Sequence, residues 1–425
     1  MRHLRRPVRG VVLSLALVAV LLPACSGARS ASRAAGRPGH ATTTTATSTA
    51  PAAPPTTTPP TTTTPQPPVS TTTTPTVEDL TWVSDTSGWA LVVQGSCNQT
   101  QTTCTDVLAT TDGGGLWRQV GSIAATSSGC IGCATPGVSH IRFANDLDGY
   151  AFGPDLFVTT DGGVTWTQEN GLYVAALEPA GTTVMRVAYT HTGCPGPCDL
   201  TIQSAPAGSA VWRTLRAPFQ GDGVELVRQG LENAYVSIFE NPAGGAESAH
   251  ATLMLSDDGG ATWSTRPDPC GDVGGDEYDT SALAAAPGSA LAALCEDRLQ
   301  PLDMYVALSL DGGSSFAAQP LLPAAEGSVE LAMTSASSIF VAFSASPGTG
   351  TTQYSMVSSA DGGRSWQEAA TDLEVKVGNP PPPPSSFLGF ESPAVGRWVV
   401  GGDVLWQTAD GGGQWVRRSF YVSSA

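Results

Sequence analysis

One glycine-rich octapeptide recurs six times in this chain, and its spacing constrains the fold more than any other feature. Each copy has a serine or threonine, an aspartate two residues later, paired glycines and a closing aromatic residue. The copies are TTDGGGLW (110–117), TTDGGVTW (159–166), SDDGGATW (256–263), SLDGGSSF (309–316), SADGGRSW (359–366) and TADGGGQW (408–415). Six copies cannot each be an active site, so the octapeptide serves a purpose that every repeat shares.

The closing aromatic residues measure the length of the repeat, and they are Trp117, Trp166, Trp263, Phe316, Trp366 and Trp415. Successive gaps between them are 49, 97, 53, 50 and 49 residues. The long gap contains APAGSAVW (205–212), in which Trp212 is in phase but Ala207 stands in place of the aspartate. The globular part of the chain, 78–425, therefore consists of seven units of similar length.

Each unit contains four short apolar segments separated by turn residues. In the second unit these begin with HIRFA (140–144) and GYAFG (149–153); DLFVTT (155–160) then runs into the octapeptide, and a fourth segment leaves from its aromatic residue. Short runs bounded by turn signals indicate strands. Four strands per unit, repeated seven times, predict an all-β, seven-bladed β-propeller with four-stranded blades. EAATDLEVK (368–376) is interpreted as one or two helical turns.

In this arrangement each octapeptide forms the hairpin between the third and fourth strands of a blade. An aspartate can accept hydrogen bonds from backbone N–H groups two residues on, and the following glycines adopt positive φ easily. The aromatic residue re-enters the sheet and is expected to pack against the next blade. We therefore interpret six aspartates as structural turn residues, namely Asp112, Asp161, Asp258, Asp311, Asp361 and Asp410.

The octapeptides resemble Asp-boxes, also called BNR repeats, whose pattern is S/T-x-D-x-G-x-T-W. Counting the altered copy, the resemblance covers residues 78–421. This superfamily includes sialidases, xyloglucan-degrading hydrolases, sortilin-type receptors and propellers similar to the photosystem II assembly (stability) factor. The last group is the most similar, because segments like GYAFG precede the boxes. That resemblance implies structural boxes at the blade periphery and a non-enzymatic scaffold.

A sialidase-like or other glycoside hydrolase is the alternative. The sialidase resemblance would require three arginines that clamp a carboxylate, a tyrosine nucleophile with an acidic partner, and an acid/base aspartate. The first arginine after residue 77 is Arg118, which lies just beyond the first box. Arg142, in HIRFAN, lacks the nearby proline of the sialidase motif. We therefore assign no catalytic residue.

The N-terminus has the pattern of an export signal. The basic MRHLRRPVRG precedes VVLSLALVAVLL, which is too short to span a bilayer and has the length of a signal-peptide core. LPAC (22–25) resembles a bacterial lipobox. We predict a signal peptide over 1–24 and lipid attachment at Cys25, which would anchor the exported protein to the outer face of the cell membrane. An ordinary secreted protein with an unpaired Cys25 is the other interpretation.

Residues 25–77 are rich in threonine and proline and are predicted to be a disordered linker. From Glu78 onward, 37 acidic residues stand against 13 basic ones, a formal charge of −24. This charge repels phosphate backbones and argues against nucleic-acid binding. The expected partners of the propeller, which we expect to be monomeric, are an envelope protein or polysaccharide.

The remaining eight cysteines are an even set in an exported chain, which indicates disulfides. Proximity in the sequence favours the pairs Cys97–Cys104, Cys130–Cys133, Cys194–Cys198 and Cys270–Cys295. The CIGC motif at 130–133 could instead be a redox or zinc site, and the acidic loop at 268–280 a calcium site. Neither has the flanking pattern such a site requires, so we expect no metal and no cofactor.

Overall fold

The structure is a computed structural model that describes residues 75–93, 105–127, 133, 135–190, 198–221, 223–240, 250–271, 278–297, 303–323, 329–345, 351–375, 387–420 and 422–423. All of them belong to one compact unit, Pro68–Ala425. Within these ranges no helix has the length and apolar character needed to cross a membrane. The predicted signal peptide and Cys25 lie outside the described residues.

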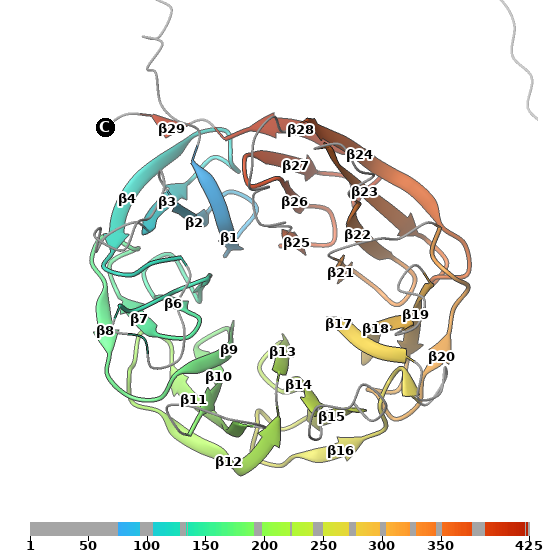
Figure 1. The fold of residues 1–425 in the computed structure, drawn as a ribbon, viewed down its shortest axis with the longest axis horizontal. Helices are drawn as coiled ribbons and strands as arrows, with labels where there is room; N and C mark the ends of the chain where they lie inside the picture. The colour runs from blue at the N-terminus through green and yellow to red at the C-terminus, as the bar shows by residue number, and fades with distance from the viewer. Residues whose placement is uncertain are drawn as a thin grey trace, which may run out of the picture. The chain divides into compact units, whose positions relative to one another are not determined.

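Seven antiparallel sheets form a ring, which confirms the predicted seven-bladed β-propeller (Figure 1). Each blade is built from four strands that follow one another in the chain. The strands are β1 (Thr76–Trp82), β2 (Gly88–Val93), β3 (Thr105–Thr110), β4 (Trp117–Ile123); β5 (His140–Phe143), β6 (Gly149–Phe152), β7 (Leu156–Thr159), β8 (Thr167–Glu169); β9 (Val174–Ala180), β10 (Thr183–Tyr189), β11 (Cys198–Pro206), β12 (Arg213–Gly221); β13 (Gly223–Gln229), β14 (Asn233–Glu240), β15 (His250–Ser256), β16 (Ser264–Arg266); β17 (Tyr278–Ala286), β18 (Ala290–Asp297), β19 (Met304–Ser309), β20 (Ala317–Ala318); β21 (Val329–Met333), β22 (Ile339–Ala345), β23 (Thr351–Ser359), β24 (Gln367–Val375); β25 (Phe387–Phe390), β26 (Gly396–Val400), β27 (Val404–Thr408) and β28 (Val416–Ser419).

The first strand of each blade lies at the centre of the ring and the fourth at its rim (Figure 1). The second strands, such as β2 and β6, are almost wholly buried, whereas the outermost strands β8 and β16 contain no buried residue. The hydrophobic core lies between adjacent blades. At the first such junction, the rings of Trp89 and Phe143 stack with their centroids 3.9 Å apart.

A short fifth strand, β29 (Val422–Ser423), pairs in parallel with β4 at the outer edge of blade 1. The preceding Phe420 is buried, and its ring lies 5.1 Å from that of Trp117. At the inner side, the Val77 N–H donates to the Gly402 carbonyl at 2.7 Å. The ring is thus closed by contacts between complete blades, a question that the sequence left open.

The one or two helical turns that EAATDLEVK could form are not found, because residues 368–375 belong to β24. It pairs with β23 from Thr351 to Ser358, with one register shift between Met356 and Val357. Ladder hydrogen bonds and packing against the neighbouring strand outweigh the modest helix propensity of these residues.

Candidate functional site

The octapeptides are hairpin turns in which the aspartate carboxylate accepts hydrogen bonds from other residues of the same turn. In the second blade, the Thr165 hydroxyl donates to Asp161 Oδ2 at 2.6 Å, and the Thr165 N–H donates to Oδ1 at 2.9 Å. The Thr159 hydroxyl also donates to Oδ1, at 2.8 Å. These three bonds, in that order, lower the pKa of Asp161 to about 2. Gly162 and Gly163 have φ values of 77° and 90°, which a side chain would disfavour.

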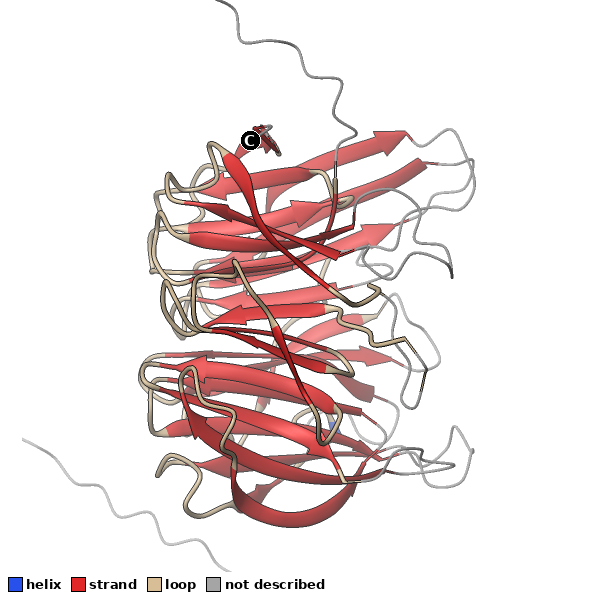
Figure 2. Ribbon diagram, turned by 90° about the vertical axis from the view of Figure 1, so that its left-hand side faces the viewer, coloured by secondary structure: helices blue, strands red, loops and turns tan. Residues whose placement is uncertain are grey.

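The other five boxes repeat this geometry. Each aspartate accepts a bond from the hydroxyl two residues before it and from the backbone N–H four residues after it: Asp112, Asp258, Asp311, Asp361 and Asp410. In the six boxes, the residue after the aspartate donates its N–H to the turn between the first and second strands of the same blade, and in blade 3 Ala207, at the aspartate position, does so. Both turns therefore lie at one end of each sheet, which we call the box face. Figure 2 shows the described loops gathered mainly at that end.

The closing aromatic residues pack toward the preceding blade, not toward the next one as expected. Trp166 of blade 2 contacts the core cluster that contains Leu91 and Val107 of blade 1. The reason is the position of the turn itself. A Cβ atom on Gly163 would lie 3.4 Å from Val107, and the Trp166 indole donates back to the Gly163 carbonyl at 2.9 Å.

Blade 3 keeps the turn although it lacks the aspartate. The Ala207 N–H still donates to the Thr182 carbonyl, at 2.9 Å. The Gly208 N–H donates to the hydroxyl oxygen of Tyr150, a buried residue of blade 2, at 2.8 Å. The guanidinium of Arg186 lies 4.0 Å from the centre of the Trp212 ring. The Val211 N–H, at the position that bonds the carboxylate in the boxes, donates instead to the Ser209 hydroxyl at 3.0 Å.

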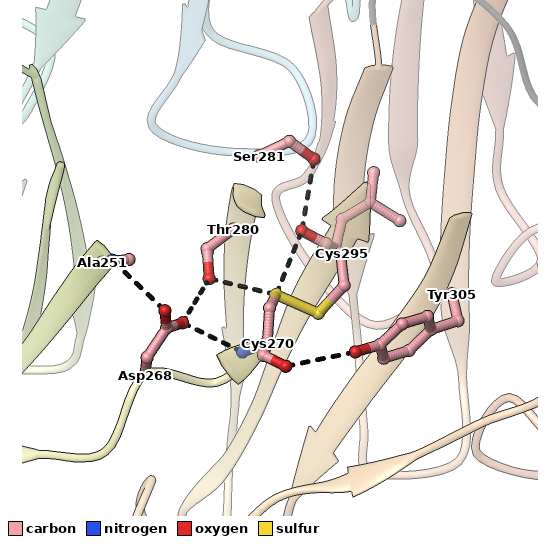
Figure 3. The surroundings of a disulfide bond; sticks show 8 residues. Ala251, Asp268, Cys270, Thr280, Ser281, Cys295 and Tyr305 are labelled. Atoms are coloured by element: carbon pink, nitrogen blue, oxygen red, sulfur yellow. Dashed lines mark hydrogen bonds between the residues drawn. A yellow bond between two sulfur atoms is a disulfide. The ribbon is translucent and has the colours of Figure 1, made fainter. Parts of the chain in front are cut away.

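Cys270 and Cys295 form a disulfide, as their isolation in the sequence predicts (Figure 3). Both are completely buried. The Tyr305 hydroxyl donates to the Cys270 carbonyl at 3.3 Å. Cys133 and Cys198 are also disulfide-bonded, and the other predicted cysteines lie outside the described residues: Cys97, Cys104, Cys130 and Cys194.

Asp268, the first residue of the acidic loop, is held by hydrogen bonds from neighbouring residues of the chain (Figure 3). Its carboxylate accepts bonds from the N–H groups of Ala251 and Cys270 and from the Thr280 hydroxyl. Residues 272–277 of this loop lie outside the described part. Among the described residues, no three His, Cys, Asp or Glu side chains are grouped to hold a metal ion.

The centre of the ring contains a cavity of about 530 Å³ that residues from all seven innermost strands line. The charged side chains among them are His140, Arg142, Glu178, Glu225, Arg228, Glu330 and Glu391. Because a central channel brings together side chains from several blades, this cavity is the candidate binding or catalytic site.

Asp79 and Arg142 form an ion pair beside this cavity. Arg142 Nη1 lies 2.6 Å from Asp79 Oδ2, and the same oxygen accepts the Ile141 N–H at 2.9 Å. Burial alone would raise the pKa of Asp79, but Arg142, His140 and the Ile141 N–H outweigh it and lower the pKa. Asp79 therefore stays ionised and joins strands β1 and β5.

Glu178 and Glu225 continue the same chain of contacts around the channel. Arg142 Nε donates to Glu178 Oε1 at 2.8 Å, which joins β5 to β9. Glu225 on β13 accepts the backbone N–H of Leu283 on β17. Burial, reinforced by the charge of Glu178, raises the pKa of Glu225 to about 7. The Arg228 guanidinium donates to the Thr183 carbonyl at 3.2 Å.

A second buried ion pair lies at the junction of blades 7 and 1. Arg397 Nη1 is 3.3 Å from Glu391 Oε2, and both side chains are at most 4% exposed. The same guanidinium lies 4.3 Å from the centre of the Trp82 ring and donates to the Asp85 carbonyl at 2.9 Å. Burial raises the pKa of Glu391 to about 7 despite the charge of Arg397.

The channel groups were not identified from the sequence, apart from Arg142, which we considered only as a sialidase residue. The signal was nonetheless present, because several first strands carry an acid within an apolar run, as in VAALEPA (174–180) and VELAM (329–333). For the sialidase alternative, arginines and carboxylates do meet at the cavity. The described residues that line it include no tyrosine.

The sequence matches no protein-family model and no curated protein. Among solved structures, it is similar to "YCF48 bound to D1 peptide" with 17% identity and a TM-score of 0.46, over 83% of this chain and 95% of that one. YCF48 from Cyanidioschyzon merolae is 15% identical with a TM-score of 0.43, over 82% and 96%. A polysaccharide lyase of family PL25, an ulvan lyase, is 9% identical with a TM-score of 0.51, over 81% and 96%. At these identities the likenesses concern the fold alone.

Proposed function

We propose that this protein is a non-enzymatic binding scaffold of the cell envelope. In this proposal Cys25 carries the lipid anchor, and residues 26–75 hold the propeller away from the membrane, because the first strand of the propeller begins at Thr76 and not after residue 77 as predicted. The propeller binds a protein or polysaccharide partner. The −24 formal charge of residues 78–425 favours such a partner over nucleic acid.

One observation carries this proposal. Every charged side chain that lines the central cavity is bonded or paired within the described part of the chain. Two sets of these contacts, Asp79–Arg142–Glu178 and Glu225–Leu283, join neighbouring innermost strands. The charges therefore support the ring, and a scaffold needs no free acid/base pair.

The test is quantitative mass spectrometry of proteins that co-purify with the tagged full-length protein from detergent-solubilised membranes. Cys25→Ala is the control, because it removes the proposed lipid site. A stoichiometric partner that depends on Cys25 is the expected result. Recovery of no protein above the control would overturn the proposal as stated.

A glycoside hydrolase is the second candidate, and Glu225 is the observation that favours it. A carboxyl group with a pKa of about 7 beside a cavity has the protonation behaviour of a general acid. We expect no turnover of chromogenic glycosides or of cell-wall polysaccharide by the wild-type protein. Turnover that Glu225→Gln abolishes would establish the hydrolase instead.

A further inference from the structure

Exposed aliphatic side chains gather on one part of the box face. Seven large hydrophobic side chains are exposed among the described residues, and five of these lie in box-face turns of blades 2 to 5. These five are Leu147 (57% exposed), Val164 (57%), Val211 (79%), Leu231 (53%) and Leu310 (64%). Single exposed aliphatic residues are ordinary, but a group on one face marks an interaction surface.

The turns that carry these residues are in contact from one blade to the next. Asp148, next to Leu147, lies directly against Gly208 in the box turn of blade 3. A Cβ atom on Gly181, in the other turn of blade 3, would lie 3.1 Å from Leu231 of blade 4. The surface therefore continues across blades 2, 3 and 4.

Blade 5 extends this surface. A hollow of about 590 Å³ lies between the turns 229–233 of blade 4 and 287–289 of blade 5. The Ser289 carbonyl accepts the Gly312 N–H at 3.0 Å, which brings the turn of Leu310 beside it. The hollow gives the arc a recess into which a side chain of a partner can fit.

The same turns carry charge of one sign only. The box-face turns of blades 2 to 5 contain no lysine or arginine and seven acids, namely Asp146, Asp148, Asp161, Glu232, Asp257, Asp258 and Asp311. The hydrogen bonds of the box hold the pKa of Asp161, Asp258 and Asp311 at about 2, so these three remain ionised at any physiological pH. The Arg228 guanidinium reaches this surface from β13 and donates to the Leu231 carbonyl at 3.3 Å, but the seven acids leave the surface around the aliphatic side chains negatively charged.

We propose that this arc, formed by Leu147, Val164, Val211, Leu231, Leu310 and the acids between them, docks a segment of another protein that carries aliphatic and basic side chains. The inference rests on the proposed scaffold function and specifies its partner. A second copy of the same surface, an anionic lipid surface or a nucleic acid would place like charges opposite each other. A segment with basic and aliphatic side chains would cover the exposed apolar side chains and neutralise the negative charge around them.

The test uses the full-length protein in detergent and a fluorescent synthetic peptide that alternates leucine and lysine. The wild-type protein should bind it with an affinity that falls as salt is raised. The double variant Val211→Ser/Leu231→Ser should weaken binding about tenfold through lost apolar contact. Because both residues are exposed, this variant should unfold at the same temperature as the wild type.

Leu321→Ser is the matched control. Leu321 is 55% exposed but lies at the opposite end of blade 5, where the neighbouring Leu322 N–H donates to the Met304 carbonyl. This variant should bind the peptide like the wild type, and a peptide alternating leucine and glutamate should not bind. Equal weakening by Leu321→Ser, or equal binding of the acidic peptide, would overturn the inference.

A second arm separates this inference from the scaffold proposal. If a Cys25-dependent partner still co-purifies with Val211→Ser/Leu231→Ser, the scaffold stands and the arc is not its docking surface. The arginines of the N-terminal segment, Arg29, Arg33 and Arg37, are the basic groups of the chain's own linker. If their replacement by serine strengthens peptide binding, the occupant is this linker and the proposed separate partner is wrong.

Discussion

At the scale of the residue, the six box aspartates show how a motif that resembles a catalytic site serves a turn. Each carboxylate accepts at least two hydrogen bonds from its own turn, and in Asp112 and Asp410 both of these bonds go to Oδ1. A lowered pKa is the electrostatic consequence of these bonds. In these turns the lowered pKa of the aspartate therefore reflects a structural role, because the groups that lower it are hydrogen-bond donors of the same turn.

SDDGGATW offers a matched pair of adjacent aspartates. Both are exposed, but Asp258 accepts bonds from Ser256 and Thr262, whereas no hydrogen bond of the Asp257 side chain is found among the described residues. We expect Asp258→Ala to lower the Tm by several degrees and Asp257→Ala to leave it unchanged, as measured by calorimetry. Because the folded pKa of about 2 lies below the usual aspartate pKa of 3.8, the stabilisation should be present above about pH 4 and be lost as the pH falls toward 2.

Glu225 behaves in the opposite way. Its folded pKa of about 7 lies above the usual glutamate pKa of 4.5, so ionisation above pH 4.5 costs the folded state free energy. Glu225→Gln should therefore stabilise the protein on the order of 2 kcal/mol at pH 8, with the gain vanishing toward pH 4.5. Chemical denaturation across this range measures it. The exposed Glu368→Gln is the control, and a gain independent of pH would contradict the cause.

At the scale of the element, blade 3 shows that a blade can lose its motif and keep its turn. Its box lacks the aspartate, and the acceptor for Gly208 comes from Tyr150 on β6 of the preceding blade. The interaction that other blades make locally is here made between blades. Such a substitution can be seen only when both blades are in place.

Tyr150→Phe removes this acceptor while it keeps the ring. The Gly208 N–H loses its partner, so the free energy of unfolding should fall by about 1 kcal/mol. Tyr235→Phe is the control, since no hydrogen bond of its hydroxyl is found among the described residues. Equal losses in the two variants would show that the Tyr150 hydroxyl contributes nothing specific to blade 3.

At the scale of the whole molecule, stability depends on how the first and last blades meet. The described contacts are the β29–β4 pairing, the Phe420–Trp117 rings and the buried Arg397–Glu391 pair over Trp82. The first two contacts lie in the outer part of this junction, and the third lies in its inner part. Because these contacts lie at different distances from the centre of the ring, together they resist the separation of blade 1 from blade 7.

Phe420→Ala tests the outer part of this junction. Phe420 is 5% exposed, and its truncation leaves a cavity against Trp117, so the free energy of unfolding should fall by about 3 kcal/mol. Val416→Ala, at a side chain 52% exposed on the same blade, should change it by less than about 0.5 kcal/mol. Denaturant unfolding of the two variants gives the comparison, and similar values would mean that the junction is not closed by Phe420.

The sequence by itself determined the number of blades, the strand order and the role of the box aspartates, because these depend on spacing and on bonds within eight residues. Only the tertiary structure decided which blade each aromatic residue packs against, how the ring closes and which charges meet in the channel. Asp79, Arg142 and Glu178 lie 63 and 36 residues apart in the chain, and only closure of the ring brings them together. The strand over 367–375 was decided in the same way, since its partner β23 outweighs its local propensity.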